Sequence, residues 1–354
     1  MEAGKLNEVD SLDKIRGVLF GTALGDALGF PCENLSQKRI NQIFGRVQSF
    51  RILGDIGYCT DDTEQTALLA TAILRSGGEK SKCTSYFKRS LAGWFLRMPF
   101  SAGMATLKAC AKILLLIPNS GVKSAGNGSA MRAAILGVVF WENAAERTEL
   151  GTAISRITHT DDRAIEGALF CASFAAILSK LPNDTSAQVV LKNCKNIVDS
   201  VRNEELKLAL KTAISLVESE TSKESAIKQL RTTGYVVHTL SFALYCTLRF
   251  GDSPFEAIVE AVNSGGDADS IGAITGAWIG AWHGASQLPN DLIAKINDGP
   301  FGKTHLEILA RNLNAKMNGQ TYEIPGYNWI HACLRNLLFI PVLLAHILRR
   351  AVPF

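Results

Sequence analysis

Two short acidic segments, far apart in the sequence, carry the residue types that bind divalent cations. The first is TDDT at 60–63 and the second is GGDADS at 265–270. Each offers two carboxylates and a hydroxyl, and hard cations such as Mg²⁺ prefer several oxygen ligands. If the segments meet in the fold, their carboxylates converge, and unit charges ~4 Å apart repel by roughly 4 kcal/mol per pair at an effective dielectric near 20. Neither segment contains Lys or Arg, so a metal centre is the simplest way to neutralise these carboxylates.

Each segment also has a simpler interpretation. Asp, Ser and Thr are the preferred N-cap residues, and both segments lie directly before stretches with a helical pattern. One residue of each segment could therefore serve only to cap a helix. Two such segments in one chain, one of them opened by a Gly-Gly pair, favour a site, although capping stays open for each segment taken alone.

A glycine-rich segment, SAGNGS at 124–129, precedes a helical run that we expect over 130–140. The free backbone N–H groups and positive dipole at the start of a helix suit a phosphate group. An ordinary Asn-Gly turn explains the same letters equally well.

Three further positions could contact a ligand. His159, in THTD at 158–161, precedes a helix expected over 163–178 and could contact a phosphate or a sugar hydroxyl; a structural role is the alternative. Tyr235 begins another expected helix and could stack on a base or fill the core. Glu33, after Pro31, could be a further metal ligand or a catalytic carboxylate, or simply a solvated side chain.

Two helices are expected to position these residues. Glycine recurs at every fourth position in two stretches, at 17, 21, 25 and 29 and again at 272, 276, 280 and 284. On a helix this spacing forms a smooth stripe on one side. Each interior glycine costs about 0.5–1 kcal/mol relative to alanine, which close backbone packing would offset. We expect two central helices that touch each other or a common neighbour.

The remaining sequence reads as helix after helix. SPFE at 253–256 is a capping box with proline at the first helical position, and it predicts a helix to about Val262. We expect Asp269 or Ser270 to begin the next helix, and TDDT to precede a helix over 64–75. Residues 183–231 indicate solvent-facing helices without chemistry. The prediction is one all-α domain over 1–354, with 1–12 as a flexible N-terminal extension.

Composition supports a globular protein and excludes several classes. The chain has 354 residues, 47% of them apolar and 20% charged, with a formal net charge of +4. This mild charge predicts no stable binding of nucleic acid. The eight cysteines are scattered without a CxxC pair, which disfavours a zinc site and a disulfide framework. The polar start is not a signal peptide, so a cytoplasmic location is expected.

The apolar stretch at 337–348 is shorter than the roughly 20 residues that span a bilayer. Pro341 interrupts it, and Arg335, Arg349 and Arg350 flank it. We predict a buried C-terminal helix, kinked at the proline, and no transmembrane segment; peripheral membrane contact is the alternative.

Six segments, in this order along nearly the whole chain, resemble the ADP-ribosylglycohydrolase family. They are GDALG (25–29) with Glu33, TDDTEQT (60–66), SAGNGSAMR (124–132), THTDDRAIEGA (158–168), GYVVHTL (234–240) and GGDADSIGAITGA (265–277). The resemblance implies a compact, orthogonal all-α helical bundle with two Mg²⁺ or Mn²⁺ ions in a central cleft.

The resemblance also implies roles for individual residues. The metal ligands by position are Thr60, Asp61, Asp62, Asp267, Asp269 and Ser270. The catalytic candidates are Glu33, Asp62 and Asp267. The contacts to the diphosphate and ribose are Ser124, Gly126, Asn127, Gly128 and His159, and Tyr235 lies near adenine. Ser270 and His238 depart from the usual family residues, and the loop MPFSAG at 98–103 lacks the acidic residue of the arginine-directed bacterial enzyme.

The implied activity is hydrolysis of the bond between an acceptor and C1 of the distal ribose of ADP-ribose. The partners are then an ADP-ribosylated substrate and the product ADP-ribose, with the acceptor left open. One alternative is an ADP-ribose-binding or crystallin-like structural member of the family. Another is a magnesium-dependent terpenoid synthase, whose acidic motifs lie within helices around an aromatic cavity; here aromatic residues make up only 8% of the chain.

Overall fold

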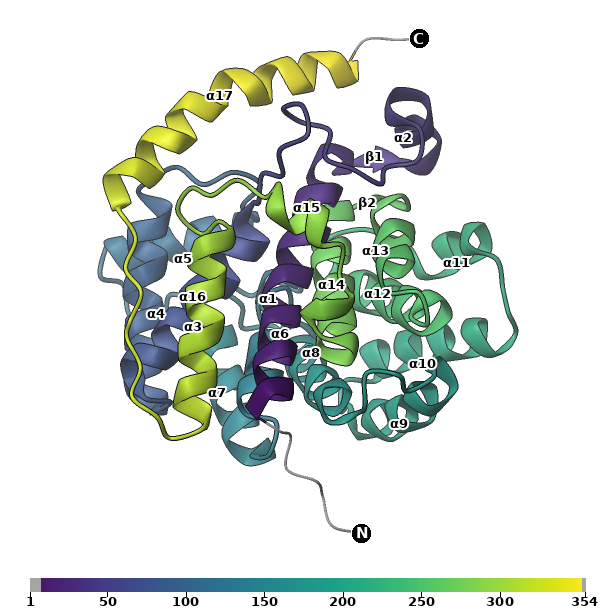
Figure 1. The fold of residues 1–354 in the computed structure, drawn as a ribbon, viewed down its shortest axis with the longest axis horizontal. Coiled ribbons are helices and arrows are strands. Elements are labelled where there is room, and N and C mark those ends of the chain that lie inside the picture. The colour runs from purple at the N-terminus through teal and green to yellow at the C-terminus, as the bar shows by residue number, and fades with distance from the viewer. Residues whose placement is uncertain (1–7, 352–354) are drawn as a thin grey trace.

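The computed structural model describes residues 8–351, and these form an assembly of α-helices with one very short sheet (Figure 1). The helices are α1 (Glu8–Gly29), α2 (Gln37–Phe44), α3 (Asp61–Ser76), α4 (Lys80–Phe95), α5 (Met104–Leu114), α6 (Ala134–Val139), α7 (Ala144–Arg156), α8 (Asp162–Lys180), α9 (Ala187–Ser200), α10 (Glu204–Glu218), α11 (Lys223–Leu230), α12 (Val236–Phe250), α13 (Pro254–Val262), α14 (Ala268–His283), α15 (Asn290–Ala294), α16 (Lys303–Met317) and α17 (Trp329–Ala351). The all-α prediction is confirmed.

Helices α1 and α14 pack directly against each other at the centre of the molecule (Figure 1). They are antiparallel: Gly21 lies against Gly276 and Gly25 against Gly272. A Cβ added at Gly21 or Gly25 would lie 2.0 Å from the backbone oxygen of the facing glycine. The predicted contact between the two glycine stripes is therefore confirmed. Gly284 is the exception, because it lies just past the end of α14 with a φ of +76°.

A two-stranded antiparallel sheet ties the end of α1 to the start of α14. Strand β1 (Leu35–Ser36) pairs with β2 (Gly265–Gly266). Both glycines of β2 have positive φ, and a Cβ at Gly266 would lie 1.9 Å from the backbone oxygen of Thr232. Only glycine fits there. The sequence did not predict this pairing, because two residues are too few to show an alternating pattern.

Several helix boundaries in the structure differ from the predicted ones. α3 begins at Asp61, three residues before the predicted start, whereas α13 ends at Val262 as expected. The helix expected over 130–140 is limited to α6, because 3-10 and turn geometry occupies the residues before it. Of the extension predicted at 1–12, residues 8–12 belong to α1, and residues 1–7 lie outside the described residues.

The C-terminal helix α17 lies along one edge of the molecule and continues past Pro341 (Figure 1). Its buried residues include Ala332, Asn336, Phe339 and His346. Its outer face is open, with Leu338 76% exposed, so the prediction of a buried helix is wrong for that face. By length and composition alone, Trp329–Arg350 is the one helix in the described part of the chain that could cross a membrane.

The glycine contact makes a direct prediction about stability. Gly276→Ala should lower the free energy of unfolding by at least about 3 kcal/mol, because the new Cβ would lie 2.0 Å from the Gly21 oxygen and the helices would have to separate. Gly93→Ala in α4 is the matched control: its Cβ meets no atom closer than 3.9 Å. That change should be neutral or stabilise by up to about 1 kcal/mol. Equal stability of both variants in chemical denaturation would contradict the packing.

Candidate metal centre and ligand cavity

The first acidic segment, 60–63 (the first acidic turn), is held in place by a carboxylate from another helix. Asp26 of α1 is fully buried and accepts hydrogen bonds from the backbone N–H groups of Thr60 (2.9 Å) and Thr63 (3.1 Å). Both threonine hydroxyls also donate to it, at 2.8 and 2.5 Å. Asp26 therefore caps α3, and the side chain of Thr60, at the N-cap position, makes no capping bond. Local capping does not account for Asp61 and Asp62.

The second acidic segment, 265–270 (the second acidic turn), contacts the first through Ser270. Its hydroxyl donates to Oδ2 of Asp62 at 3.2 Å. Asp267 occupies the N-cap position of α14 without a side-chain capping bond, and its backbone N–H donates to Thr232 at 2.6 Å. The Asp267 side chain therefore does not serve as an ordinary cap of its own helix.

Glu33 completes the acidic group. One carboxylate oxygen each from Glu33, Asp267 and Asp269 lies within 4.8 Å of the other two. Glu33 precedes β1 and Asp267 follows β2, so the β1–β2 pairing sets this proximity. Asp61 lines the same cavity as these three residues, whereas Asp62 is buried and is not part of the lining.

The electrostatics of this group suit a divalent cation. Burial raises the pKa of Asp61, Asp62 and Asp269 well above the usual range, and neighbouring carboxylates raise them further. Burial also raises the pKa of Asp267, to about 6, with Glu33 adding to the shift. The Oδ1 atom of Asp62 is buried and has no hydrogen-bond partner among the described residues. An all-oxygen set with mutual repulsion and an unpaired buried oxygen fits Mg²⁺ or Mn²⁺.

A cavity of about 280 Å³ extends from the acidic group to the glycine-rich segment 124–129 (the glycine loop). Its lining comprises Glu33, Asp61, Ser101, Gly103, Met104, Ala105, Thr106, Ser124, Gly126, Asn127, Gly128, Met131, His159, Gly234, Asp267, Asp269 and Ser270. None of these residues is Phe, Tyr or Trp, so this cavity lacks the aromatic lining expected of a terpenoid synthase. Two hydroxyls predicted as metal ligands differ in position: Ser270 lines the cavity, whereas Thr60 is turned to Asp26.

His159 lies beside the glycine loop as a neutral imidazole. Burial, with a contribution from Arg132, lowers its pKa to about 3. Its Nδ1 lies 2.8 Å from the Thr158 hydroxyl, which also accepts from Arg132 at 2.7 Å. Because Arg132 can only donate, the Thr158 hydroxyl is favoured as the donor to Nδ1 of His159. Nδ1 is then the acceptor, and the ring proton of the neutral imidazole lies on Nε2. A Cβ at Gly126 would lie 3.5 Å from that Nε2 atom.

The loop itself differs from the expectation in two ways. It contains a three-residue 3-10 turn, Asn127–Ser129, and turn geometry follows it at 130–133 in place of an α-helix, so the helix-dipole argument for a phosphate site does not apply. The Asn127 amide donates to Asp267 and, at 3.0 Å, to the Thr239 hydroxyl. In this structure Asn127 positions a carboxylate of the acidic group.

Tyr235 lies outside the cavity lining, although the neighbouring Gly234 belongs to it. The Tyr235 hydroxyl donates to Glu205 at 2.6 Å and accepts from Arg163 at 2.9 Å. A contact between Tyr235 and adenine stays a prediction, and it would be made at the outer edge of the site.

Two residues with clear roles in the site were missed by sequence reasoning. Asp26 was given no role from the sequence, yet a carboxylate on a buried helix face is a signal that it needs donors. Ser101 contacts the acidic group by donating to Glu33 and, at 3.4 Å, to Asp269. Its loop carries no local signal, since its position depends on distant packing.

Comparisons with known proteins identify the family to which this sequence is similar. The sequence model of the ADP-ribosylglycohydrolase family matches residues 7–323. An uncharacterized protein from Archaeoglobus fulgidus is 33% identical over 85% of this chain and 96% of its own length. The ADP-ribosylarginine hydrolase Tri1 of Serratia proteamaculans is 29% identical over 82% of this chain and 76% of its own. A solved ADP-ribosylglycohydrolase-related protein complex aligns with a TM-score of 0.67 at 26% identity, covering 87% of this chain and 99% of that one.

The acidic group predicts how metal affinity responds to charge removal. Asp62→Asn and Asp267→Asn should each weaken Mn²⁺ binding by at least about tenfold in calorimetric titration. Without metal, Asp62→Asn should be at least as stable as the wild type, because burial and like charges disfavour the Asp62 carboxylate. Asp55→Asn, at an exposed ion pair with Lys295, is the control and should leave affinity unchanged. Unaltered Mn²⁺ affinity in both site variants would show that these carboxylates bind no metal.

Proposed function

The chain belongs to the ADP-ribosylglycohydrolase family, and we propose that it is a metal-dependent hydrolase that removes ADP-ribose from a modified acceptor. The bond cleaved joins the acceptor to C1 of the distal ribose. The observation that carries this proposal is the meeting of two buried acidic turns in a cavity that they share with the glycine loop.

Two Mg²⁺ or Mn²⁺ ions are proposed as cofactors. The residues proposed to hold them are Asp61, Asp62, Asp267 and Asp269, with the hydroxyls of Thr60 and Ser270. Bound divalent ions supply Lewis acidity, which polarises substrate oxygens and brings the pKa of water toward neutrality. Asn127 donates a hydrogen bond to Asp267 and Ser270 donates one to Asp62, so each of these two carboxylates is held in place.

Glu33 is the proposed proton acceptor. It is only partly buried and faces the cavity, while its carboxylate accepts hydrogen bonds from Ser101 and, at 3.1 Å, from Asn34. The oxygen of a water molecule forms a bond to C1, and the bond from C1 to the acceptor atom breaks with its electron pair on that atom. The proton that Glu33 takes from water returns to the acceptor, so Glu33 ends the cycle unchanged.

The other side of the cavity is proposed to bind the ADP-ribose diphosphate and proximal ribose. His159 supports this role because its neutral imidazole presents Nε2 beside Gly126 and Gly128. Gly128 has little spare room, since a Cβ there would lie 2.9 Å from the imidazole. The small residues thus allow an oxygen-rich ligand to approach the backbone.

Turnover of a panel of ADP-ribosylated acceptors tests the function. Peptides modified on serine and on arginine should release free ADP-ribose with Mg²⁺ or Mn²⁺, and a chelator should stop the release. Glu33→Gln should lower kcat by about 100-fold or more, since it removes a positioned base. The exposed Glu79→Gln should have no effect. Release that is insensitive to chelator would contradict a metal-dependent reaction, and no release from any acceptor would favour a structural or binding role.

Binding of free ADP-ribose is a separate test. At about 100 times its dissociation constant it should contribute roughly 2.7 kcal/mol of stability, visible as a rise in melting temperature. Gly126→Ala should reduce this rise, because its methyl group would occupy cavity space beside His159 while meeting only ordinary contacts at 3.5 Å. Gly326→Ala, which has no atom within 4 Å of the added Cβ, is the control. A melting temperature raised by an isoprenyl diphosphate and not by ADP-ribose would contradict the proposal.

A further inference from the structure

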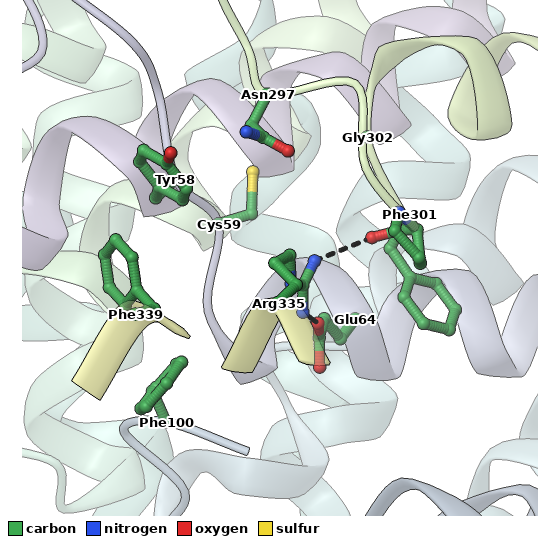
Figure 2. Close-up of a pocket in the computed structure, with 10 residues that line it drawn as sticks. Tyr58, Cys59, Glu64, Phe100, Asn297, Phe301, Gly302, Arg335 and Phe339 are labelled. Atoms are coloured by element: carbon green, nitrogen blue, oxygen red, sulfur yellow. Dashed lines mark hydrogen bonds and ion pairs between the residues drawn. The ribbon is translucent and has the colours of Figure 1, made fainter. Parts of the chain in front are cut away.

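The inner face of α17 contacts the helix that carries the first acidic turn. Arg335 donates to Glu64 (Figure 2) and, at 2.8 Å, to the backbone oxygen of Pro300. Glu64 is buried, and it also accepts from Arg97 at 3.0 Å and from Trp94 at 2.7 Å. Because Glu64 lies in the first turn of α3, this network connects α17 to the turn that contains Asp61 and Asp62.

The far end of α17 holds the backbone around Glu33. Arg350 donates to the backbone oxygen of Glu33, and Nε2 of His346 lies 3.2 Å from the backbone oxygen of Pro31. These contacts fix both ends of the short segment that presents the Glu33 carboxylate to the cavity. The Glu33 carboxylate itself accepts hydrogen bonds from Ser101 and Asn34.

The middle of α17 supports the loop that carries Ser101. The Asn336 amide donates to the backbone oxygens of Arg97 and Met98, at 2.8 and 3.3 Å. Phe339 packs against Phe100, as Figure 2 shows, and their ring centroids are 5.2 Å apart. Met98 and Ser101 both have positive φ, at 54° and 57°. Such conformations are costly for residues other than glycine and persist where surrounding contacts enforce them.

We propose that α17 is a positioning element of the site: it sets Glu33 and the Ser101 loop, and thereby determines which acceptors are accepted and how fast they are released. This inference rests on the proposed hydrolase function. Ser101 is the proposed specificity-determining residue, because it lies against both Glu33 and Asp269, where the acceptor must leave. The glycine loop and His159 make no part of this network, so the affinity for the ADP-ribose portion should be independent of α17.

The first test compares neighbouring residues of α17 that face in opposite directions. Phe339→Ala should speed amide hydrogen exchange at 97–103, because it removes the ring that packs on Phe100. It should lower kcat by at least about tenfold, since a misplacement of ~1 Å can cost about 100-fold. It should also change the ratio of rates on serine- and arginine-linked substrates, with the affinity for free ADP-ribose unchanged. Leu338→Ala, at a residue 76% exposed, is the control and should match the wild type in every measurement.

The second test concerns the hydrogen bond to the Glu33 backbone. Arg350→Ala should lower kcat, whereas Arg350→Lys, which keeps a cationic donor, should restore much of it. Arg349→Ala is the matched control, because the Arg349 guanidinium lies over the ring of Phe44 in α2. A purely structural role for Arg350 would show as equal losses of melting temperature in both alanine variants and no rescue by lysine.

Two outcomes would overturn the inference. One is unchanged exchange at 97–103 together with unchanged kcat in Phe339→Ala. The other is a loss of ADP-ribose affinity in parallel with turnover, which would make α17 a support of the whole cavity. Failure of the proposed function is distinguishable from both, because a wild-type protein without hydrolytic activity would still permit the hydrogen-exchange comparison between Phe339→Ala and Leu338→Ala.

Discussion

The direct backbone contact between α1 and α14 is the constraint on which the site depends. Facing glycines leave room for no side chain, so the register of the two antiparallel helices is fixed. Gly29 at the end of α1 lies on Ala268 at the start of α14. The chain that leaves α1 must therefore pass beside the chain that enters α14, and β1 pairs with β2 at that point. Glu33 and Asp267 are brought together because two helices touch without side chains between them.

Electrostatic repulsion is the cost of this arrangement. Burial and like charge raise the pKa of the carboxylates, which means that the folded chain disfavours their ionised forms. The ionised form of Asp26 is disfavoured in the same way. Burial raises its pKa to about 6, even though two backbone N–H groups and two hydroxyls of Thr60 and Thr63 donate to it. A cation that binds only the folded state would relieve the repulsion and stabilise the fold by mass action. Binding of the proposed metal ions would thus couple metal affinity to stability.

Local signals in the sequence predicted much of this architecture, and long-range contacts account for what they missed. The glycine spacing identified the central helices, and the two acidic turns were recognised from their local sequence motifs. The start of α3 was misplaced because its cap comes from Asp26, on a different helix. The β1–β2 pair and the Ser101 loop were invisible for the same reason: each is defined by a partner more than sixty residues away. A single sequence shows such partners only where both carry a strong local pattern.

In the proposed reaction the two sides of the cavity have different chemical tasks, and their construction differs. Every ADP-ribosylated molecule presents the same diphosphate and riboses, whereas acceptors differ in charge and size. The glycine loop, His159 and both acidic turns lie within the segment that matches the family, while α17 begins after it. A contact common to all substrates can be built from shared sequence. The side proposed to meet the variable acceptor is supported here by a helix outside that segment, so a change in α17 is expected to alter acceptor choice together with the rate of cleavage at C1, because α17 also positions Glu33.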